Sequence, residues 1–439
     1  MINRISIRKK RIISVLLFLA VLLLSLGACI RLVEHKSSKI KYTDFFESDT
    51  DYDCYLLGSS ITLNSLLPME MWENYGISAY NFGSSNCTPA EDFYIAREAM
   101  KYKKPKLVVM DMLGVVEFNE IGNGKYMYTQ VEGQHTQFDC FPYSKTKAEA
   151  VNDLFDIYDD RNDFLWNFIM YHNRWGELEE QDFRWREMLN VEKGALTNVG
   201  TLGKAEFKPY LKDETTSLEG VNYDYFIRLV EYCRDEGIDV LALYLPHPSE
   251  ELNQRVANSI GAVADRYDNL EYINMLDMDL LDPYTDFTSD NLHPNLSGAL
   301  KISDYIGKYI RDNYDVSDFR DDPEWIDASD KYIEYKKENI IKQEALPYYL
   351  VQLSDDDFYC DLTLYNDEIM NDEWFLRLFE NAGITPVNES AKGNEECDAK
   401  ITVYRTGTGE VVDKAVFKYK EKTSYDRTIF DLQKTEDPD

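Results

Sequence analysis

The sequence predicts an α/β fold, with a parallel β-sheet core and further segments inserted into it and appended after it. Short apolar stretches of strand length alternate along the chain with amphipathic stretches of helical periodicity, which is typical of a parallel sheet covered by helices. Hydrophobic residues make up 44% of the chain and aromatic residues 13%, which is enough for ordinary packed cores. With 439 residues, the chain is long enough for two or three domains.

The first segment, residues 1–33, predicts a membrane anchor. The basic residues Arg8–Arg11 precede an apolar run that continues to Val33, and a helix of this length can span a bilayer with its basic flank in the cytoplasm. An alternative interpretation takes Leu26–Cys29 as a lipoprotein cleavage and lipidation site. The uncleaved helix is the preferred interpretation because the apolar run continues past Cys29. Both interpretations predict a tethered protein whose body lies outside the cytoplasm.

A polar tether at residues 34–52 leads into the predicted sheet core, which comprises residues 53–118 and 221–316. A helix is predicted at Pro89–Met100, and amphipathic helices precede the last two strands of this core. Residues 119–220, between the two halves, are rich in aromatic and charged residues and predict a mainly helical insertion. The apolar stretches that predict buried strands lie at residues 54–57, 78–83, 107–112, 239–246 and 270–274.

Two further segments follow the core. Residues 317–344 form an acidic connector. Residues 345–439 differ from the core in their sequence pattern, with strand-like stretches at residues 360–368, 399–407 and 410–420. A Gly-x-Gly turn joins the last two of these stretches, as in a β-hairpin. The sequence therefore predicts a small α+β domain at the carboxyl end of the chain.

Composition argues against two classes of partner. The formal net charge is -33, whereas nucleic-acid binding depends on lysine and arginine residues that neutralise phosphates, so no nucleic acid is expected. The seven cysteines form no Cys-x-x-Cys motif and no Cys/His cluster, so we expect neither a metal ion nor another cofactor.

Three residues from two distant parts of the chain predict a nucleophilic site. Ser60 comes just past the first strand and at the start of a helix, where open α/β sheets bind their ligands. Asp290 and His293 form an Asp-x-x-His-Pro motif before a second helix, and Pro294 suits the first turn of that helix. A carboxylate at this spacing can orient the imidazole, which then acts as the general base for a serine hydroxyl.

The sequence resembles the SGNH/GDSL hydrolase superfamily in four blocks, "LLGSSI" at Leu56–Ile61, "YNFGSSNCT" at Tyr80–Thr88, "PKLVVMDM" at Pro105–Met112 and "DNLHP" at Asp290–Pro294. The resemblance implies a three-layer SGNH-like core with Ser60 as nucleophile, His293 as base and Asp290 as its orienting carboxylate. The "GSS" form, "YHNRW" at Tyr171–Trp175 and "RDDPEW" at Arg320–Trp325 resemble membrane-anchored SGNH proteins of Gram-positive bacteria. These are similar to the DltD and AlgJ/AlgX groups, which are linked to acyl transfer on cell-envelope polymers.

The chain departs from the family pattern at two oxyanion donors. The second-block glycine aligns with Asn86, which still offers a backbone N–H and adds a side-chain amide. The third-block asparagine falls at about Val115, which has no side-chain donor, and the loss of one donor can cost on the order of a hundredfold in rate. His172 or Arg174 of the insertion could supply a replacement. His135 and His247 are expected to be structural, with His247 lining the pocket as the alternative.

The expected function is therefore that of an extracytoplasmic serine esterase or O-acyltransferase. Its partner would be an acylated glycan or envelope polymer, with the membrane contacted through the amino-terminal helix. The sequence does not distinguish a hydrolase from a transferase. An alternative is a catalytically silent glycan-binding or envelope scaffold protein that keeps the same fold.

Overall fold

The computed structural model describes residues 7–34, 36–117, 138–139, 141–154, 164–165, 171–188, 191–200, 204–392, 396–419 and 432–435. The chain divides into two compact units. One consists of Met1–Ser48 and Tyr128–Asn190, and the other of Asp49–Met127 and Val191–Asp439. The second unit contains the sheet core and the carboxyl-terminal segment, and we describe it first.

A five-stranded parallel sheet forms the centre of this unit, which confirms the predicted α/β class. Its strand order is β2-β1-β3-β4-β5, and every neighbouring pair is parallel. The first four strands of the chain are almost wholly buried because helices cover both faces of the sheet. The strands are β1 (Cys54–Leu57), β2 (Ala79–Asn81), β3 (Leu107–Asp111), β4 (Asp239–Tyr244) and β5 (Leu270–Asn274).

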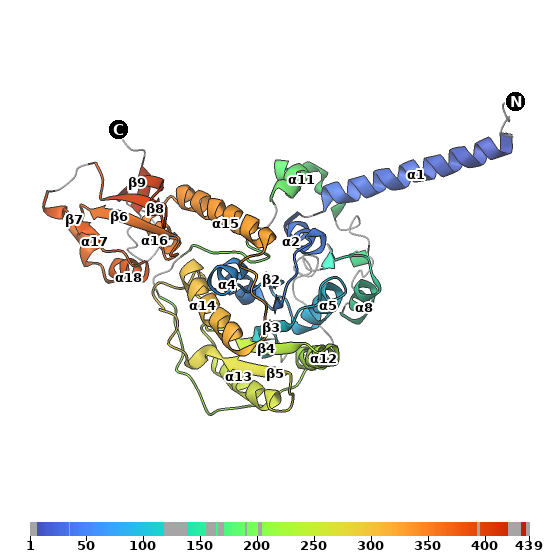
Figure 1. Cartoon of the computed structure of the whole chain (residues 1–439), viewed down its shortest axis with the longest axis horizontal. Helices are drawn as coiled ribbons and strands as arrows, with labels where there is room; N and C mark the ends of the chain where they lie inside the picture. Colours follow the sequence, from blue (N-terminus) through green and yellow to red (C-terminus); the bar gives the residue numbers. More distant parts are fainter. Residues whose placement is uncertain are drawn as a thin grey trace. The chain divides into compact units, whose positions relative to one another are not determined.

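Helices pack on the sheet in two groups. Helix α14 packs against α3 and α4, whereas α5 packs against α12. Figure 1 shows the sheet between the α4–α14 pair and the α5–α12 pair, which gives three layers. The helices of the core are α3 (Ser60–Ser65), α4 (Pro68–Tyr75), α5 (Pro89–Ala99), α6 (Leu113–Glu117), α12 (Val221–Glu236), α13 (Glu251–Ala264) and α14 (Leu296–Asn313).

Local sequence sets where these helices begin. Thr88 and Glu91 form a reciprocal capping box at the start of α5, and proline follows the cap. Asn295 caps α14, where its side chain accepts a hydrogen bond from the N–H of Gly298. The predicted helix at Pro89–Met100 therefore agrees closely with α5.

The carboxyl-terminal segment contains a second, mixed sheet with strand order β10-β9-β8-β6-β7. Strands β8 and β9 are antiparallel neighbours joined by a turn in which Gly407 and Gly409 have φ angles of 80° and 69°. This agrees with the hairpin expected around the Gly-x-Gly turn. The elements are α16 (Leu346–Gln352), β6 (Phe358–Leu364), α17 (Asp367–Asn371), α18 (Glu373–Asn381), β7 (Val387–Asn388), β8 (Ala399–Arg405), β9 (Val411–Tyr419) and β10 (Leu432–Thr435).

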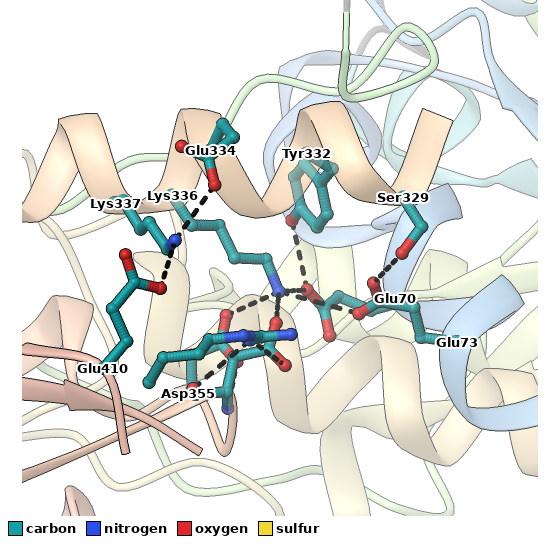
Figure 2. Close-up of polar contacts among 11 residues, drawn as sticks. Glu70, Glu73, Ser329, Tyr332, Glu334, Lys336, Lys337, Asp355 and Glu410 are labelled. Atoms are coloured by element: carbon teal, nitrogen blue, oxygen red, sulfur yellow. Dashed lines mark hydrogen bonds and ion pairs between the residues drawn. The ribbon is translucent and has the colours of Figure 1, made fainter. Parts of the chain in front are cut away.

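The acidic connector contains a long helix, α15 (Pro323–Lys342), that joins the two sheets through a buried ionic network. Lys336 lies at the centre of this network, and its ammonium group is 2.7 Å from Glu70 of α4 and 2.8 Å from both Asp355 and Asp357. Figure 2 shows Lys336 reaching from α15 toward Glu70 and Asp355. The network ties α4 of the core to the loop before β6.

The other unit contains α1 (Ile7–Val33), which is long and apolar enough to cross a membrane. Its apolar window has no buried residues. The described remainder of the unit is helical, with α2 (Lys36–Glu47), α8 (Lys145–Leu154), η1 (Arg174–Gly176), α11 (Glu180–Arg184) and η2 (Trp185–Met188). Residues 191–200 and 204–220 of the predicted insertion contain no helix or strand, and they lie along the core instead.

Candidate active site

The structure brings Ser60, Asp290 and His293 together. His293 Nε2 lies 2.7 Å from Ser60 Oγ, although the two residues are 233 positions apart in the chain. The other ring nitrogen, Nδ1, lies 2.6 Å from Asp290 Oδ2. This geometry suits an Nδ1–H that donates to the carboxylate, which leaves Nε2 to accept the serine proton.

Asp290 is held in its charged form. Its Oδ1 accepts hydrogen bonds from the N–H of Leu292 at 2.9 Å, the N–H of His293 at 3.0 Å and the hydroxyl of Thr288 at 2.8 Å. Partial burial alone would raise the pKa of Asp290, but these hydrogen bonds and that from the His293 ring outweigh it and lower the pKa to about 2. Asp290 can therefore orient the imidazole and stabilise its protonated form at any physiological pH.

The turn before Ser60 needs a glycine. Gly58 has a φ of 140°, and a Cβ at this position would lie 2.5 Å from Thr62 Oγ1 and 2.7 Å from Asp111 Cβ. The next residue, Ser59, caps α3 by accepting from the N–H of Ile61, and its hydroxyl lies 3.0 Å from Asp111 Oδ2. This turn ends β1 and sets Ser60 as the first residue of α3.

Asn86 lies on the loop that follows β2, the parallel neighbour of β1, and it is exposed with a φ of 55°. The carboxyl ends of parallel neighbours meet at one edge of the sheet, and the N–H of Ser84 donates to the carbonyl of Gly58 at 3.1 Å. The loop of Asn86 therefore packs on the nucleophile turn. Its role as an oxyanion donor stays a prediction.

The two candidates from the insertion, His172 and Arg174, belong to the other compact unit. His172 is exposed. Arg174 donates to the carbonyl of Val33 and lies 3.4 Å from the carboxylate of Asp182, so its guanidinium is engaged within its own unit. A role for either residue at Ser60 stays a prediction.

Of the two histidines expected to be structural, the structure describes His247. His247 is buried, its Nδ1 lies 2.8 Å from the carbonyl of Leu245 and its Nε2 lies 3.3 Å from the hydroxyl of Tyr244. Burial lowers the pKa of His247 to about 4, so the ring is neutral at pH 7. These contacts suit the structural role expected from the sequence. His135 lies outside the described residues.

Sequence reasoning missed two residues that hold the catalytic loop. Asn295 is fully buried, and its side-chain amide donates to the carbonyls of Thr285 at 2.7 Å and Gly200 at 3.0 Å. Thr288 donates to Asp290, as described above. Asn295 had a recognisable signal, since an asparagine directly before an apolar helical pattern favours a helix cap. Thr288 had none, because its partner depends on how the loop folds.

The described residues include no cluster of three or more histidine, cysteine, aspartate or glutamate side chains that could hold a metal ion. Val115, at the position of the third-block asparagine, is fully buried in α6. The contacts among Ser60, His293 and Asp290 can provide a nucleophile, a general base and an orienting carboxylate.

No protein-family model matches this chain, and no curated protein matches it. Among solved structures, the chain is similar to a protein from Streptococcus pneumonia named for platelet activating factor, with 13% sequence identity and a TM-score of 0.33 over 66% of this chain and 98% of that chain. A family 3 carbohydrate esterase from Clostridium thermocellum shares 10% identity, with a TM-score of 0.30 over 60% of this chain and 96% of its own. A gut microbial diltiazem-metabolizing enzyme shares 14% identity, with a TM-score of 0.21 over 60% of this chain and 47% of its own. These low TM-scores establish no family, so the functional proposal is based on the geometry of the site.

Proposed function

We propose that this protein is a serine esterase or O-acyltransferase that works through an acyl-enzyme. The observation that carries the proposal is the continuous contact from Ser60 Oγ through the His293 ring to Asp290, at 2.7 Å and 2.6 Å. A nucleophile, a base and an orienting carboxylate in this order are the requirements of nucleophilic acyl chemistry.

In the first half of the reaction, His293 Nε2 accepts the proton of Ser60 while Ser60 Oγ attacks the acyl carbonyl carbon. The carbonyl oxygen then carries a negative charge, for which the backbone N–H groups of Ser60 and Asn86 are the proposed donors. When the tetrahedral intermediate collapses, the alcohol leaves with the proton from His293. The acyl group stays on Ser60 as an ester.

In the second half, an acceptor hydroxyl attacks this ester while His293 removes its proton. The bond to Ser60 breaks, and Ser60 Oγ regains a proton from His293. If the acceptor is water, the product is a carboxylic acid and the protein is an esterase. If the acceptor is a sugar or polyol hydroxyl, the protein is a transferase, with the same residues in the same roles.

The proposed substrate is an acyl ester of a cell-envelope glycan or polymer. Helix α1 has the length and composition of a membrane span, with basic residues at its amino-terminal end. The positive-inside rule favours the cytoplasm for that end, and it thus favours the body of the protein on the outer side, beside envelope polymers. Lipid anchoring through Cys29 would lead to the same compartment.

The proposal is tested by reacting the purified protein with a fluorophosphonate, which labels activated serines. We expect one label, on Ser60, and none on the Ser60→Ala variant. A folded wild-type protein that resists labelling would instead support a catalytically silent glycan-binding or envelope scaffold protein. The buried Val115, which offers no donor at the third-block position, is the observation that favours this second candidate.

A further inference from the structure

The carboxyl-terminal domain packs directly on the helix that follows the catalytic histidine. Leu296 and Ala299, in the first turns of α14, are buried in one apolar cluster with Phe375, Leu378 and Phe379 of α18. Helix α14 begins three residues after His293. The core of the added domain and the start of the catalytic helix are thus a single packed cluster.

The polar side of α18 contacts the loop that leads to the catalytic residues. The indole N–H of Trp374 donates to the carbonyl of Tyr284 at 3.1 Å. The guanidinium of Arg377 lies 4.3 Å from the centre of the Tyr284 ring, and it lies 3.3 Å from Asp282 Oδ2. Helix α18 therefore holds residues 282–284 through both backbone and side-chain contacts.

Asn381, the last residue of α18, completes a ring of contacts around Asp286. Its Oδ1 accepts from Lys301 Nζ at 2.7 Å, and Lys301 Nζ lies 2.6 Å from Asp286 Oδ2. Its Nδ2 donates to the Ser297 hydroxyl, which donates to Asp286 Oδ1 at 2.7 Å. Asp286 is fully buried, and Lys301 is its ion-pair partner in this ring.

Asp286 in turn fixes the two ends of the loop that carries the catalytic pair. Its carbonyl accepts from the N–H of Asn295 at 2.9 Å, and the N–H of Thr288 donates to the carbonyl of His293 at 2.9 Å. A β-bridge pairs Phe287 with Pro294 between these two bonds. The segments on either side of Asp290 are therefore closed on each other, and Asp286 lies at the base of that closure.

We propose that α18 of the carboxyl-terminal domain is a positioning element of the active site. Asn381 is its positioning residue, and it acts through Lys301 and Asp286 to keep the His293 ring on Ser60. This inference rests on the proposed function. It assigns the added domain a part in the acyl chemistry of the core. A change far from the reacting atoms can slightly displace a catalytic group, and this displacement can cost on the order of a hundredfold in rate.

The test compares Asn381→Leu with wild type in the full-length protein. Leucine keeps the approximate volume of asparagine but removes the amide that bridges Lys301 and Ser297. We expect the rate of fluorophosphonate labelling at Ser60 to fall about ten- to a hundredfold. We also expect its pH midpoint to move, because the Asp290–His293 contact is no longer held in place. A change in packing alone would lower the melting temperature without moving that midpoint.

Three further variants make the result decisive. Asn371→Leu removes an exposed asparagine of α17, whose side chain donates to the carbonyl of Asp367 in its own helix at 2.7 Å, and it should label like wild type. Asn381→Gln keeps the amide and should recover most of the rate. Trp374→Phe removes the hydrogen bond to Tyr284 and keeps an aromatic ring at the edge of the apolar cluster, so it should slow labelling in the same direction even if Asn381→Leu fails to fold.

The outcomes separate this inference from the proposed function. Wild-type protein that is not labelled contradicts the proposed function itself. Wild-type protein that is labelled, together with Asn381→Leu and Trp374→Phe proteins that match its rate and pH midpoint, overturns only the positioning role of α18.

Discussion

Two adjacent serines follow β1, and their surroundings differ. Ser59 is 2% exposed, and its hydroxyl both caps α3 and contacts Asp111. Ser60 is only partly buried, and its hydroxyl contacts the His293 ring. A nucleophile must be reachable by substrate and joined to a base, so Ser60 has the properties of a nucleophile and Ser59 those of a structural residue.

This difference predicts opposite results for the two alanine variants. Ser59→Ala should still be labelled at Ser60 by a fluorophosphonate. Its free energy of unfolding should fall by about 1–2 kcal/mol, because α3 loses its cap and Asp111 loses a hydrogen-bond partner. Urea denaturation followed in parallel with labelling measures both effects. A folded Ser59→Ala protein that takes no label would reverse the assignment of the nucleophile.

Asp290→Asn tests the orienting carboxylate. Because the pKa of Asp290 is lowered to about 2, its charge persists down to that pH, and the loss of activity on mild acidification should not come from this residue. Asparagine cannot stabilise an imidazolium, so we expect turnover to fall by roughly a thousandfold or more. Ester hydrolysis measured from pH 5 to pH 9 provides the check. A variant with near-normal turnover would remove Asp290 from the mechanism.

At the scale of single elements, local sequence patterns predicted the strands, one helix and part of the active site. The strands and α5 were predictable from apolar runs and a capping signature, and Asp290 and His293 were predictable because they lie in one short motif. The contact of Asn381 with Ser297, by contrast, joins residues 84 positions apart, one on α18 and the other on α14. No local periodicity encodes which side chains meet across such a distance.

The ionic network around Lys336 also connects residues that are far apart in the chain. It makes the contact between α4 and the loop before β6 sensitive to pH. Burial raises the pKa of Glu70 to about 7, and the nearby Lys336 opposes but does not cancel this effect. Lys336 stays protonated because its carboxylate neighbours outweigh its burial. The titratable and charged groups of the network are Glu70, Glu73, Tyr332, Lys336, Asp355, Asp357 and Arg405.

The stability of the protein should therefore fall as the pH rises and Glu70 loses its proton. An unfolded chain releases this proton near the ordinary value of 4.5, whereas the folded protein keeps it until about pH 7. The folded state thus binds more protons between these values, and the stability contributed below pH 4.5 is lost as the pH rises through 7. Glu70→Gln should show a smaller decline in its urea midpoint between pH 5 and pH 8. The matched control, Glu338→Gln on the exposed side of α15, should decline as wild type does, and equal declines in all three proteins would contradict the prediction.

At the scale of the whole molecule, a helix that is long and apolar enough to cross a membrane stands at the start of a strongly acidic chain. Helix α1 carries basic residues at its amino-terminal end, whereas the chain as a whole has a formal charge of -33. The basic residues beside the apolar span favour retention of the amino-terminal end in the cytoplasm. An acidic surface also keeps the body soluble and repels it from anionic lipid, so contact with the membrane should be limited to the anchor.

Cys29 distinguishes the two forms of anchor, because a lipoprotein needs its thiol and an uncleaved helix does not. If α1 stays uncleaved, Cys29→Ala should remain in the membrane fraction at the same size as wild type. In both wild type and variant, protease added to intact cells should digest the body, because we expect the basic end of α1 to stay inside. A Cys29→Ala protein that leaves the membrane or changes in size would instead establish the lipid anchor. Full protection from protease would place the body in the cytoplasm and exclude an envelope polymer as its substrate.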